Sequence, residues 1–315
     1  MSKKSTYLLG IVLTIVIGSF LYWYLCCSIC CKKQGCKVKE TPQEVIKDDL
    51  GKPNVKEPTF FPFSIKDANG DFNFSIDESF NFNESSFSIR DSISGNLNNG
   101  ILKIKEYLDA NGDKRFNITG YYTSDETNNS AFPNLGLARA NSVKNHMVSQ
   151  GISSRLINTY GELKDDMYAD ENGVLFGPLA FNVFTRTEAS AANDEALKNA
   201  CEAIKENPLM LYFKTGSAHI NLTTEQRQKF ANISRCVDKL GLTIQVVGHT
   251  DNTGNADSNL QLGQKRADFV KTYLVRNGIL QENIETSSQG QNDPIADNAT
   301  EEGRAKNRRI VVTIN

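Results

Sequence analysis

The sequence predicts an α/β (α+β) sandwich, built as two tandem βαβαβ domains that follow an N-terminal transmembrane helix. Three observations support this prediction. An uncharged apolar segment lies near the N-terminus, one block of sequence occurs twice in the chain, and strand-like and helix-like patterns alternate within each occurrence. The chain has 315 residues, which is enough for two domains of ordinary size.

Residues 7–27 are predicted to cross a membrane as part of an N-terminal anchor at 1–31. No charged residue occurs from Ser5 to Cys31, and about 20 apolar residues suffice to span roughly 30 Å of hydrocarbon as a helix. Lysines flank both sides of the segment, so they do not settle its orientation. A cleaved signal peptide is the alternative, but no small-x-small cleavage site follows the apolar run.

Five of the seven cysteines crowd at the end of the apolar segment and just beyond it: Cys26, Cys27, Cys30, Cys31 and Cys36. Disulfides between chains, apolar cysteines at a helix end, and a metal site are the open interpretations. The cluster lacks the separated pairs and histidines of a zinc signature. Residues 32–58 are polar, contain three prolines and are predicted to form a flexible tether.

The repeated block shows the organisation of the rest of the chain. Residues 135–157 align with residues 262–284 with ten identities in 23 positions. Upstream, FNITGYYTSDE from Phe116 matches IQVVGHTDNTG from Ile244 in residue type, and FNFNESSFSI from Phe80 matches LYFKTGSAHI from Leu211. We therefore expect two copies of one domain, at 59–187 and 207–315, joined by a linker helix at 188–206.

The elements of the second copy are predicted in the order strand, helix, strand, helix, strand. They are a strand at 211–214, a helix from Thr223 or Thr224 to the terminator Gly241, a strand at 242–250, a helix ending at Gly278, and a closing strand at 308–314. In the second helix, Leu262, Val270 and Leu274 recur at helical spacing and are predicted to face the sheet. Asn259 and Arg266 share another face, directed toward Asp251.

Two cysteines outside the N-terminal cluster are predicted to pair. Cys201 lies in the linker helix, and Cys236 lies late in the first helix of the second copy. In an oxidising compartment the disulfide Cys201–Cys236 would close a loop of about 35 residues. Two buried free thiols are the alternative.

Three motifs carry a family resemblance. GHTDNTG at 248–254, N-x-x-L-G-x-x-R-A beginning at Asn259, and NRRIVV beginning at Asn307 stand in order over about 105 residues. Together they resemble the OmpA-like C-terminal domain, also called the peptidoglycan-associated domain. That family's β/α sandwich binds the diaminopimelate of uncrosslinked peptidoglycan stems, so the resemblance implies that Asp251 and Arg266 recognise this ligand here.

The residue types suit that ligand. Diaminopimelate ends in an ammonium and a carboxylate on one carbon; an arginine can hold the carboxylate through two hydrogen bonds, while an aspartate accepts from the ammonium. Asn259 and Thr253 are expected to add neutral hydrogen bonds. Arg309 resembles the family's closing arginine, or else supports the site from behind. A structural salt bridge between a loop and a helix is the alternative interpretation of the pair.

The first copy, at about 61–186, departs from this pattern. Arg139 matches Arg266, but Thr123 stands in the place of Asp251 and Phe132 in the place of Asn259. The closing strand from Leu179 has no arginine. We expect this copy to keep the fold for structure or for a contact with an envelope protein, although Asp125 or Glu126 could still reach the pocket through a changed loop.

The composition and motifs exclude other functions. A net charge of -2 argues against a polybasic nucleic-acid binder. His146, His219 and His249 are isolated, and no catalytic motif occurs, so no enzyme, cofactor or metal site is predicted.

The predicted function is non-covalent peptidoglycan binding that tethers a membrane-anchored protein to the cell wall. The domains would lie in the periplasm of a diderm bacterium, with the anchor in the inner rather than the outer membrane. The alternative is a component of an envelope-spanning secretion or injection assembly, in which wall binding only positions the complex.

Overall fold

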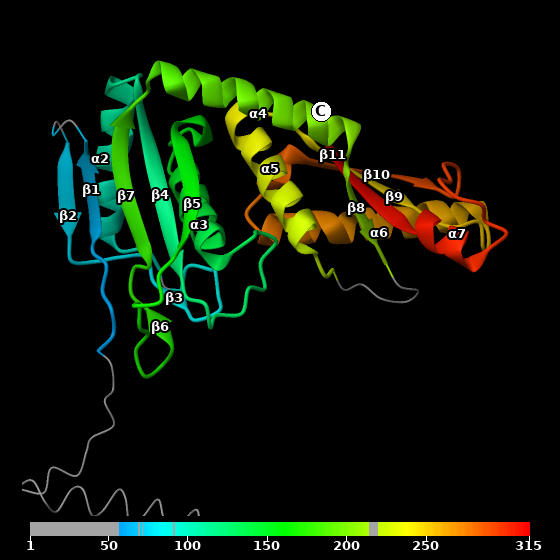
Figure 1. The fold of residues 1–315 in the computed structure, drawn as a ribbon, viewed down its shortest axis with the longest axis horizontal. Coiled ribbons are helices and arrows are strands. Elements are labelled where there is room, and N and C mark those ends of the chain that lie inside the picture. The colour runs from blue at the N-terminus through cyan, green and yellow to red at the C-terminus, as the bar shows by residue number, and fades with distance from the viewer. Residues whose placement is uncertain (1–56, 69, 71, 91, 214–219) are drawn as a thin grey trace, which may run out of the picture. The chain divides into compact units, whose positions relative to one another are not determined.

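The computed structural model describes residues 57–315, apart from residues 69, 71, 91 and 214–219 and the side chains of 188–194 (Figure 1). The predicted membrane segment at 7–27, the five clustered cysteines and nearly all of the predicted tether lie outside the described residues. Among the residues that are described, no helix is both long and apolar enough to cross a membrane.

The N-terminal half contains a five-stranded sheet with the strand order β2-β1-β7-β4-β5. Apolar side chains of α2, α3 and one face of this sheet form a single core. Buried and less buried residues alternate along β4, so its other face carries the polar side chains. The elements of this half are β1 (Phe63–Asp67), β2 (Asn73–Ile76), β3 (Phe82–Asn83), α2 (Gly95–Ala110), β4 (Lys114–Tyr122), α3 (Leu135–Ser149), η1 (Ser154–Leu156), β5 (Ile157–Leu163), β6 (Val174–Leu175) and β7 (Leu179–Thr185).

The C-terminal half contains a four-stranded sheet with the order β10-β9-β11-β8. Helices α4, α5 and α6 contribute buried apolar residues to the core against this sheet. The elements are α4 (Glu188–Glu206), β8 (Leu209–Tyr212), α5 (Thr224–Leu240), β9 (Ile244–His249), α6 (Ala256–Arg276), η2 (Gln281–Asn283), β10 (Ile284–Gly290), α7 (Glu301–Asn307) and β11 (Arg309–Ile314). The chain is thus a mixed α/β protein.

Three strands are arranged alike in the two sheets, and the strand beside them differs. In both halves the middle strand pairs in parallel with one neighbour, β4 with β5 and β9 with β10, and antiparallel with the other, β7 or β11. In the C-terminal sheet the fourth strand, β8, runs antiparallel to β11. In the N-terminal sheet the strand at that position, β1, runs parallel to β7. The segment from Phe80, which the sequence matches to β8, instead contributes β3 to a separate two-stranded sheet with β6.

Paired glycines fix how closely the main helix approaches the middle strand. A Cβ on Gly248 of β9 would lie 2.0 Å from the carbonyl oxygen of Gly263 in α6. In the N-terminal half, a Cβ on Gly120 of β4 would likewise lie 2.0 Å from the carbonyl oxygen of Gly136 in α3. The Leu-Gly pair repeated in the sequence therefore encodes the same close helix-to-strand contact in both halves.

The helix predictions hold with one correction. Thr223 caps α5 in a capping box with Gln226, and Gly241 ends it in the left-handed region at φ 71°. Val270 and Leu274 are buried, as predicted, but Leu262 is 40% exposed. Leu262 cannot face the sheet because Gly263 occupies the contact with β9, and adjacent residues on a helix point in different directions.

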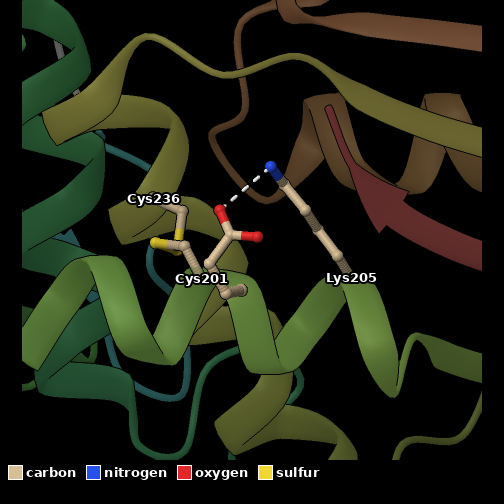
Figure 2. Close-up of a disulfide and its surroundings, with 4 residues drawn as sticks. Cys201, Lys205 and Cys236 are labelled. Atoms are coloured by element: carbon tan, nitrogen blue, oxygen red, sulfur yellow. Dashed lines mark hydrogen bonds and ion pairs between the residues drawn. A yellow bond between two sulfur atoms is a disulfide. The ribbon is translucent and has the colours of Figure 1, made fainter.

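Helix α4 is joined covalently to α5 by the disulfide Cys201–Cys236 (Figure 2). Both cysteines are buried in the core of the C-terminal half. Glu202 and Lys205, on an outer face of α4, form an ion pair at 3.1 Å. The linker helix therefore packs as part of the C-terminal half.

The two halves contact each other through polar and aromatic groups. Lys144 of α3 forms an ion pair with Asp238 of α5. The backbone N–H of Ala131 donates to the side chain of Asn277 at 2.7 Å. The ring of Phe132 packs edge-on against Phe230, with 5.0 Å between ring centroids.

Candidate ligand-binding site

The turn after β9 positions Asp251 at the head of α6. Asn255 caps this helix by accepting hydrogen bonds from the backbone N–H groups of Asp257 and Ser258. Within the turn, Oδ1 of Asp251 accepts from the backbone N–H of Thr253 at 3.0 Å. The Asp251 side chain is 13% exposed, so solvent still reaches the carboxylate.

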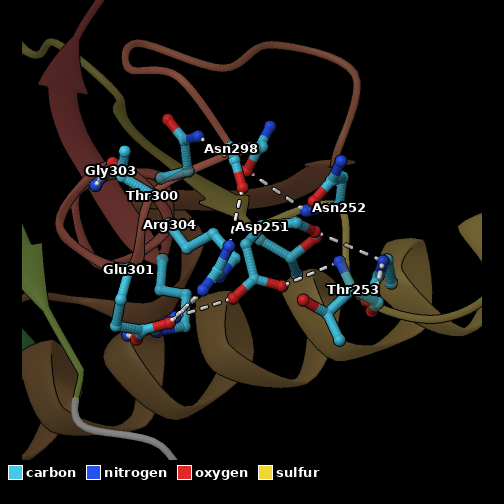
Figure 3. Close-up of polar contacts among 12 residues, drawn as sticks. Asp251, Asn252, Thr253, Asn298, Thr300, Glu301, Gly303 and Arg304 are labelled. Carbon is cyan, nitrogen blue, oxygen red and sulfur yellow. Dashed lines mark hydrogen bonds and ion pairs between the residues drawn. The ribbon is translucent and has the colours of Figure 1, made fainter.

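The second oxygen of Asp251 is bound by an arginine that the sequence analysis did not select. Arg308, at the end of α7, donates from Nη1 to Oδ2 of Asp251 at 2.8 Å and from Nη2 to Glu301 at 2.7 Å. Figure 3 shows Asp251 between Thr253 of the turn and Glu301 at the start of α7. Burial raises the pKa of Asp251, but the hydrogen bonds from Arg308 and Thr253 outweigh it and lower the pKa below its ordinary value.

Arg266 lies beside this carboxylate with binding capacity left over. Its side chain is half-buried, and its Nη1 atom is buried with no hydrogen-bond partner among the described residues. Burial lowers the pKa of Arg266, the Asp251 carboxylate opposes that shift, and the Arg308 cation reinforces it. A buried guanidinium nitrogen without an acceptor is costly, so a bound anion would relieve it.

Asn259 and Thr253 hold the turn. The side-chain nitrogen of Asn259 lies within hydrogen-bond distance of the carbonyl oxygens of Asp251 and Thr253 and of the Gln291 side chain, at 3.3, 3.1 and 2.7 Å. Asn259 is 5% exposed, whereas Thr253 is exposed. These contacts fix the shape of the turn, and they occupy the amide donor that the sequence analysis expected to contact a ligand.

Arg309 belongs to a different cluster. It is 2% exposed and donates to the carbonyl oxygen and carboxylate of Asp293 at 3.1 and 3.0 Å. His249 packs beside the same carboxylate, with Nδ1 3.6 Å from it. Burial, reinforced by Arg309, lowers the pKa of His249 to about 4, so this histidine is neutral at pH 7. Arg309 thus braces the loop behind the site, while Arg308 faces Asp251.

The matching arginine of the N-terminal half is fully engaged by its own chain. Arg139 is 0% exposed and donates to both carboxylate oxygens of Glu126, through Nη1 and Nη2. Its remaining contacts go to the carbonyl oxygens of Tyr121 and Ser86, at 2.8 and 3.0 Å. Glu126, rather than Asp125, therefore occupies the place of the acidic partner, and this arginine has little capacity left for a ligand.

One residue of these sites, Arg308, was not selected from the sequence, and another, Glu126, was named only as one of two possibilities. Arg308 stands beside Arg309 in NRRIVV, and the sequence alone does not show which of the two enters the site. Glu126 was named as able to reach the pocket, but only the loop geometry shows that it binds Arg139.

Comparisons with known proteins agree with these motifs. The profile of the OmpA family matches residues 81–174 and 212–308, together more than half of the chain. The peptidoglycan-binding protein ArfA of Mycobacterium bovis is 42% identical over 87 residues, 26% of this chain and 27% of that protein. The peptidoglycan-associated lipoprotein of Buchnera aphidicola is 45% identical over 69 residues, 22% of this chain and 40% of that protein.

A solved structure also matches part of the chain. The crystal structure of the peptidoglycan-associated lipoprotein from Burkholderia pseudomallei is 29% identical, and the match covers 34% of this chain and 89% of that one, with a TM-score of 0.29. The matches to ArfA and the Buchnera lipoprotein span well under two thirds of the length of either protein.

Proposed function

Since the chain belongs to the OmpA family, we propose that it binds peptidoglycan non-covalently through the diaminopimelate stem and so tethers a membrane-anchored protein to the cell wall. The observation that carries the proposal is the buried, unpartnered Nη1 of Arg266 beside the partly exposed carboxylate of Asp251. The names of the relatives, a peptidoglycan-binding protein and a peptidoglycan-associated lipoprotein, support the same ligand.

In this proposal the two ends of the ligand's amino acid head meet opposite charges. Its carboxylate accepts from Arg266, and its ammonium donates to Asp251. A carboxylate offers about four lone-pair sites, so Asp251 retains acceptor capacity beyond its contacts with Arg308 and Thr253. Arg308 holds the Asp251 carboxylate in place and keeps it ionised.

We propose that residues 207–315 form the peptidoglycan-binding domain and residues 59–187 a degenerate copy of it. The glycine contacts and the shared strand pairings support a duplication. The saturated Arg139 supports a structural or protein-contact role for the N-terminal copy. Residues 1–31 would supply the anchor, residues 32–58 the tether and α4 the linker helix, with both domains in the periplasm.

Co-sedimentation of the full-length chain with purified sacculi tests this function. Asp251→Ala and Arg266→Ala are each expected to abolish sedimentation. The first leaves the ligand's ammonium without a partner, and the second leaves its carboxylate without one. Arg276→Ala is the matched control, since it removes an exposed arginine from the same helix. Unchanged circular dichroism shows that folding is intact, and sedimentation of both site variants at the level of the control would refute the assignment.

A further inference from the structure

A second concave surface lies away from the Asp251 site, where the open face of the first sheet meets α4 and α5. It is a groove of about 670 Å³. Strands β4, β5 and β7 contribute residues from the face opposite their buried core; for example, Arg115 and Asn117 alternate with the buried Phe116 and Ile118. The groove therefore exists only because both halves of the chain pack together.

The groove is strongly cationic although the chain as a whole has a net charge of -2. Among the lining residues that the structure describes, Glu195 is the acidic one, and it pairs with Lys198 at 3.3 Å. The basic residues of the lining come from five different segments: Arg115, Arg155, Arg186, Lys198, Arg235 and Lys239. Such a concentration of one charge sign in a concave surface focuses the potential toward an anion.

Two of these cations are available to a ligand. Arg155 and Arg235 are exposed, and neither side chain forms an ion pair or hydrogen bond with any residue that the structure describes. Arg115, in contrast, is oriented by the carbonyl oxygens of Gly112 and Lys114, which accept from its Nη1 at 3.0 and 2.7 Å. The groove thus combines a fixed guanidinium with two that have no counterion among the described side chains.

Lys239 shows that the cations of the groove lie close enough to repel one another. Its Nζ donates to the backbone carbonyl oxygens of Arg155 and Ile157, which hold it in the groove wall. Burial lowers the pKa of Lys239 to about 8; Arg235 and Arg115 add to this effect, and Asp238 opposes it. An anion in the groove would offset this mutual repulsion.

We propose that this groove binds an oligoanion whose charged groups are phosphates. A phosphate presents three acceptor oxygens in a tetrahedral arrangement, so it can accept from guanidinium groups that approach from different elements. A carboxylate presents two oxygens in one plane, which suits a single arginine better. The spread of the groove's arginines over β4, η1, α5 and the end of β7 therefore favours phosphate.

Titration of the full-length chain in non-ionic detergent micelles with inorganic tripolyphosphate at low ionic strength tests the proposal. Because each change removes a charged hydrogen-bond donor and adds a carboxylate, we expect Arg155→Glu and Arg235→Glu each to weaken binding at least about tenfold. Arg276→Glu, which makes the same charge change on an exposed arginine outside the groove, is expected to change binding less than about twofold. Neither groove variant loses a described hydrogen bond or ion pair, so both should fold.

The outcomes separate the groove from general charge attraction. No measurable binding by the unmodified chain, or equal weakening by Arg276→Glu, would overturn the proposal. Tricarballylate, a tricarboxylate of similar charge, should bind more weakly, and equal affinity for it would overturn the preference for phosphate.

Two sources share this phosphate chemistry, a soluble oligophosphate and a lipid headgroup. The titration is therefore repeated in micelles doped with phosphatidylglycerol. Competition by the lipid assigns the groove to headgroups, and unchanged binding assigns it to soluble phosphates.

Discussion

Removal of the Glu126 carboxylate should destabilise the N-terminal half by about 3–5 kcal/mol, the usual cost of breaking a buried ion pair from one side. The Glu126 side chain is 4% exposed, and Arg139 is 0% exposed. The carboxylate also accepts from the backbone N–H groups of Thr123 and Ser85 at 3.0 and 2.9 Å. Glu126→Ala would therefore leave a buried charge and two partly buried amides without a partner.

Urea unfolding followed by far-ultraviolet circular dichroism measures this effect. Circular dichroism is chosen over fluorescence because the single tryptophan, Trp23, lies outside the described residues. The double variant Glu126→Leu with Arg139→Met should recover part of the loss, because no unpaired charge remains, although the amides of Thr123 and Ser85 still lack their acceptor. Sacculus binding should persist in a folded variant. A loss of stability below about 1 kcal/mol for Glu126→Ala would refute the inference that Arg139 depends on its own chain.

Three further perturbations have defined outcomes. Arg308→Ala should raise the pKa of Asp251, as measured by NMR, and weaken sacculus binding. The pKa of Asp251 is lower in the folded protein than in the unfolded chain. Its contribution to stability is therefore present above the unfolded pKa and is lost as the pH falls through the folded pKa. An unchanged pKa would contradict the role of Arg308. Because the unfolded chain protonates His249 at a higher pH than the folded protein does, the unfolding free energy should fall as the pH drops from about 6.5 to about 4, by up to about 1.4 kcal/mol per pH unit. His249→Gln should reduce this pH dependence of the unfolding free energy, measured by urea titrations. Reduction of Cys201–Cys236, which closes a span of 35 residues, should lower the unfolding free energy by about 3–4 kcal/mol, and equal stability with and without reductant would show that the disulfide is dispensable.

The sequence predicts the C-terminal half well because its signals are local. The capping box at Thr223, the terminator Gly241 and the apolar spacing of Val270 and Leu274 depend on residues within a few positions of one another. Each of these signals determines where a helix begins, where it ends or which side it buries, and the structure agrees with each. The direction of β1 next to β7, in contrast, depends on a long-range pairing for which the chain has no local signal.

The choice between Arg308 and Arg309 shows a different limit. Successive residues at the start of a strand point to opposite faces, so a one-residue difference decides which arginine enters the site. Arg309 turns to Asp293, and Arg308, which is the C-cap residue of α7, turns to Asp251. The motif predicts that an arginine closes the site, but only the register of β11 against β9 identifies it.

The difference between the two arginine sites follows from where the main helix begins. Helices α3 and α6 end at aligned residues, Ser149 and Arg276, but α3 has 15 residues and α6 has 21. The residues that would form the missing turns of α3 are instead a loop, capped into the helix by Asn134. That loop carries Phe132 into the contact with Phe230 of the other half.

The long loop between β4 and α3 also carries Glu126 to Arg139. In the C-terminal half, α6 starts at Ala256, so the short turn before it holds Asp251 beside Arg266 and leaves Nη1 of that arginine without an acceptor. In the N-terminal half, the longer loop places the Glu126 carboxylate where it accepts from both terminal nitrogens, Nη1 and Nη2, of Arg139. The six-residue difference in helix length thus accompanies the difference between an arginine with an unpartnered Nη1 and one that is paired within its own half.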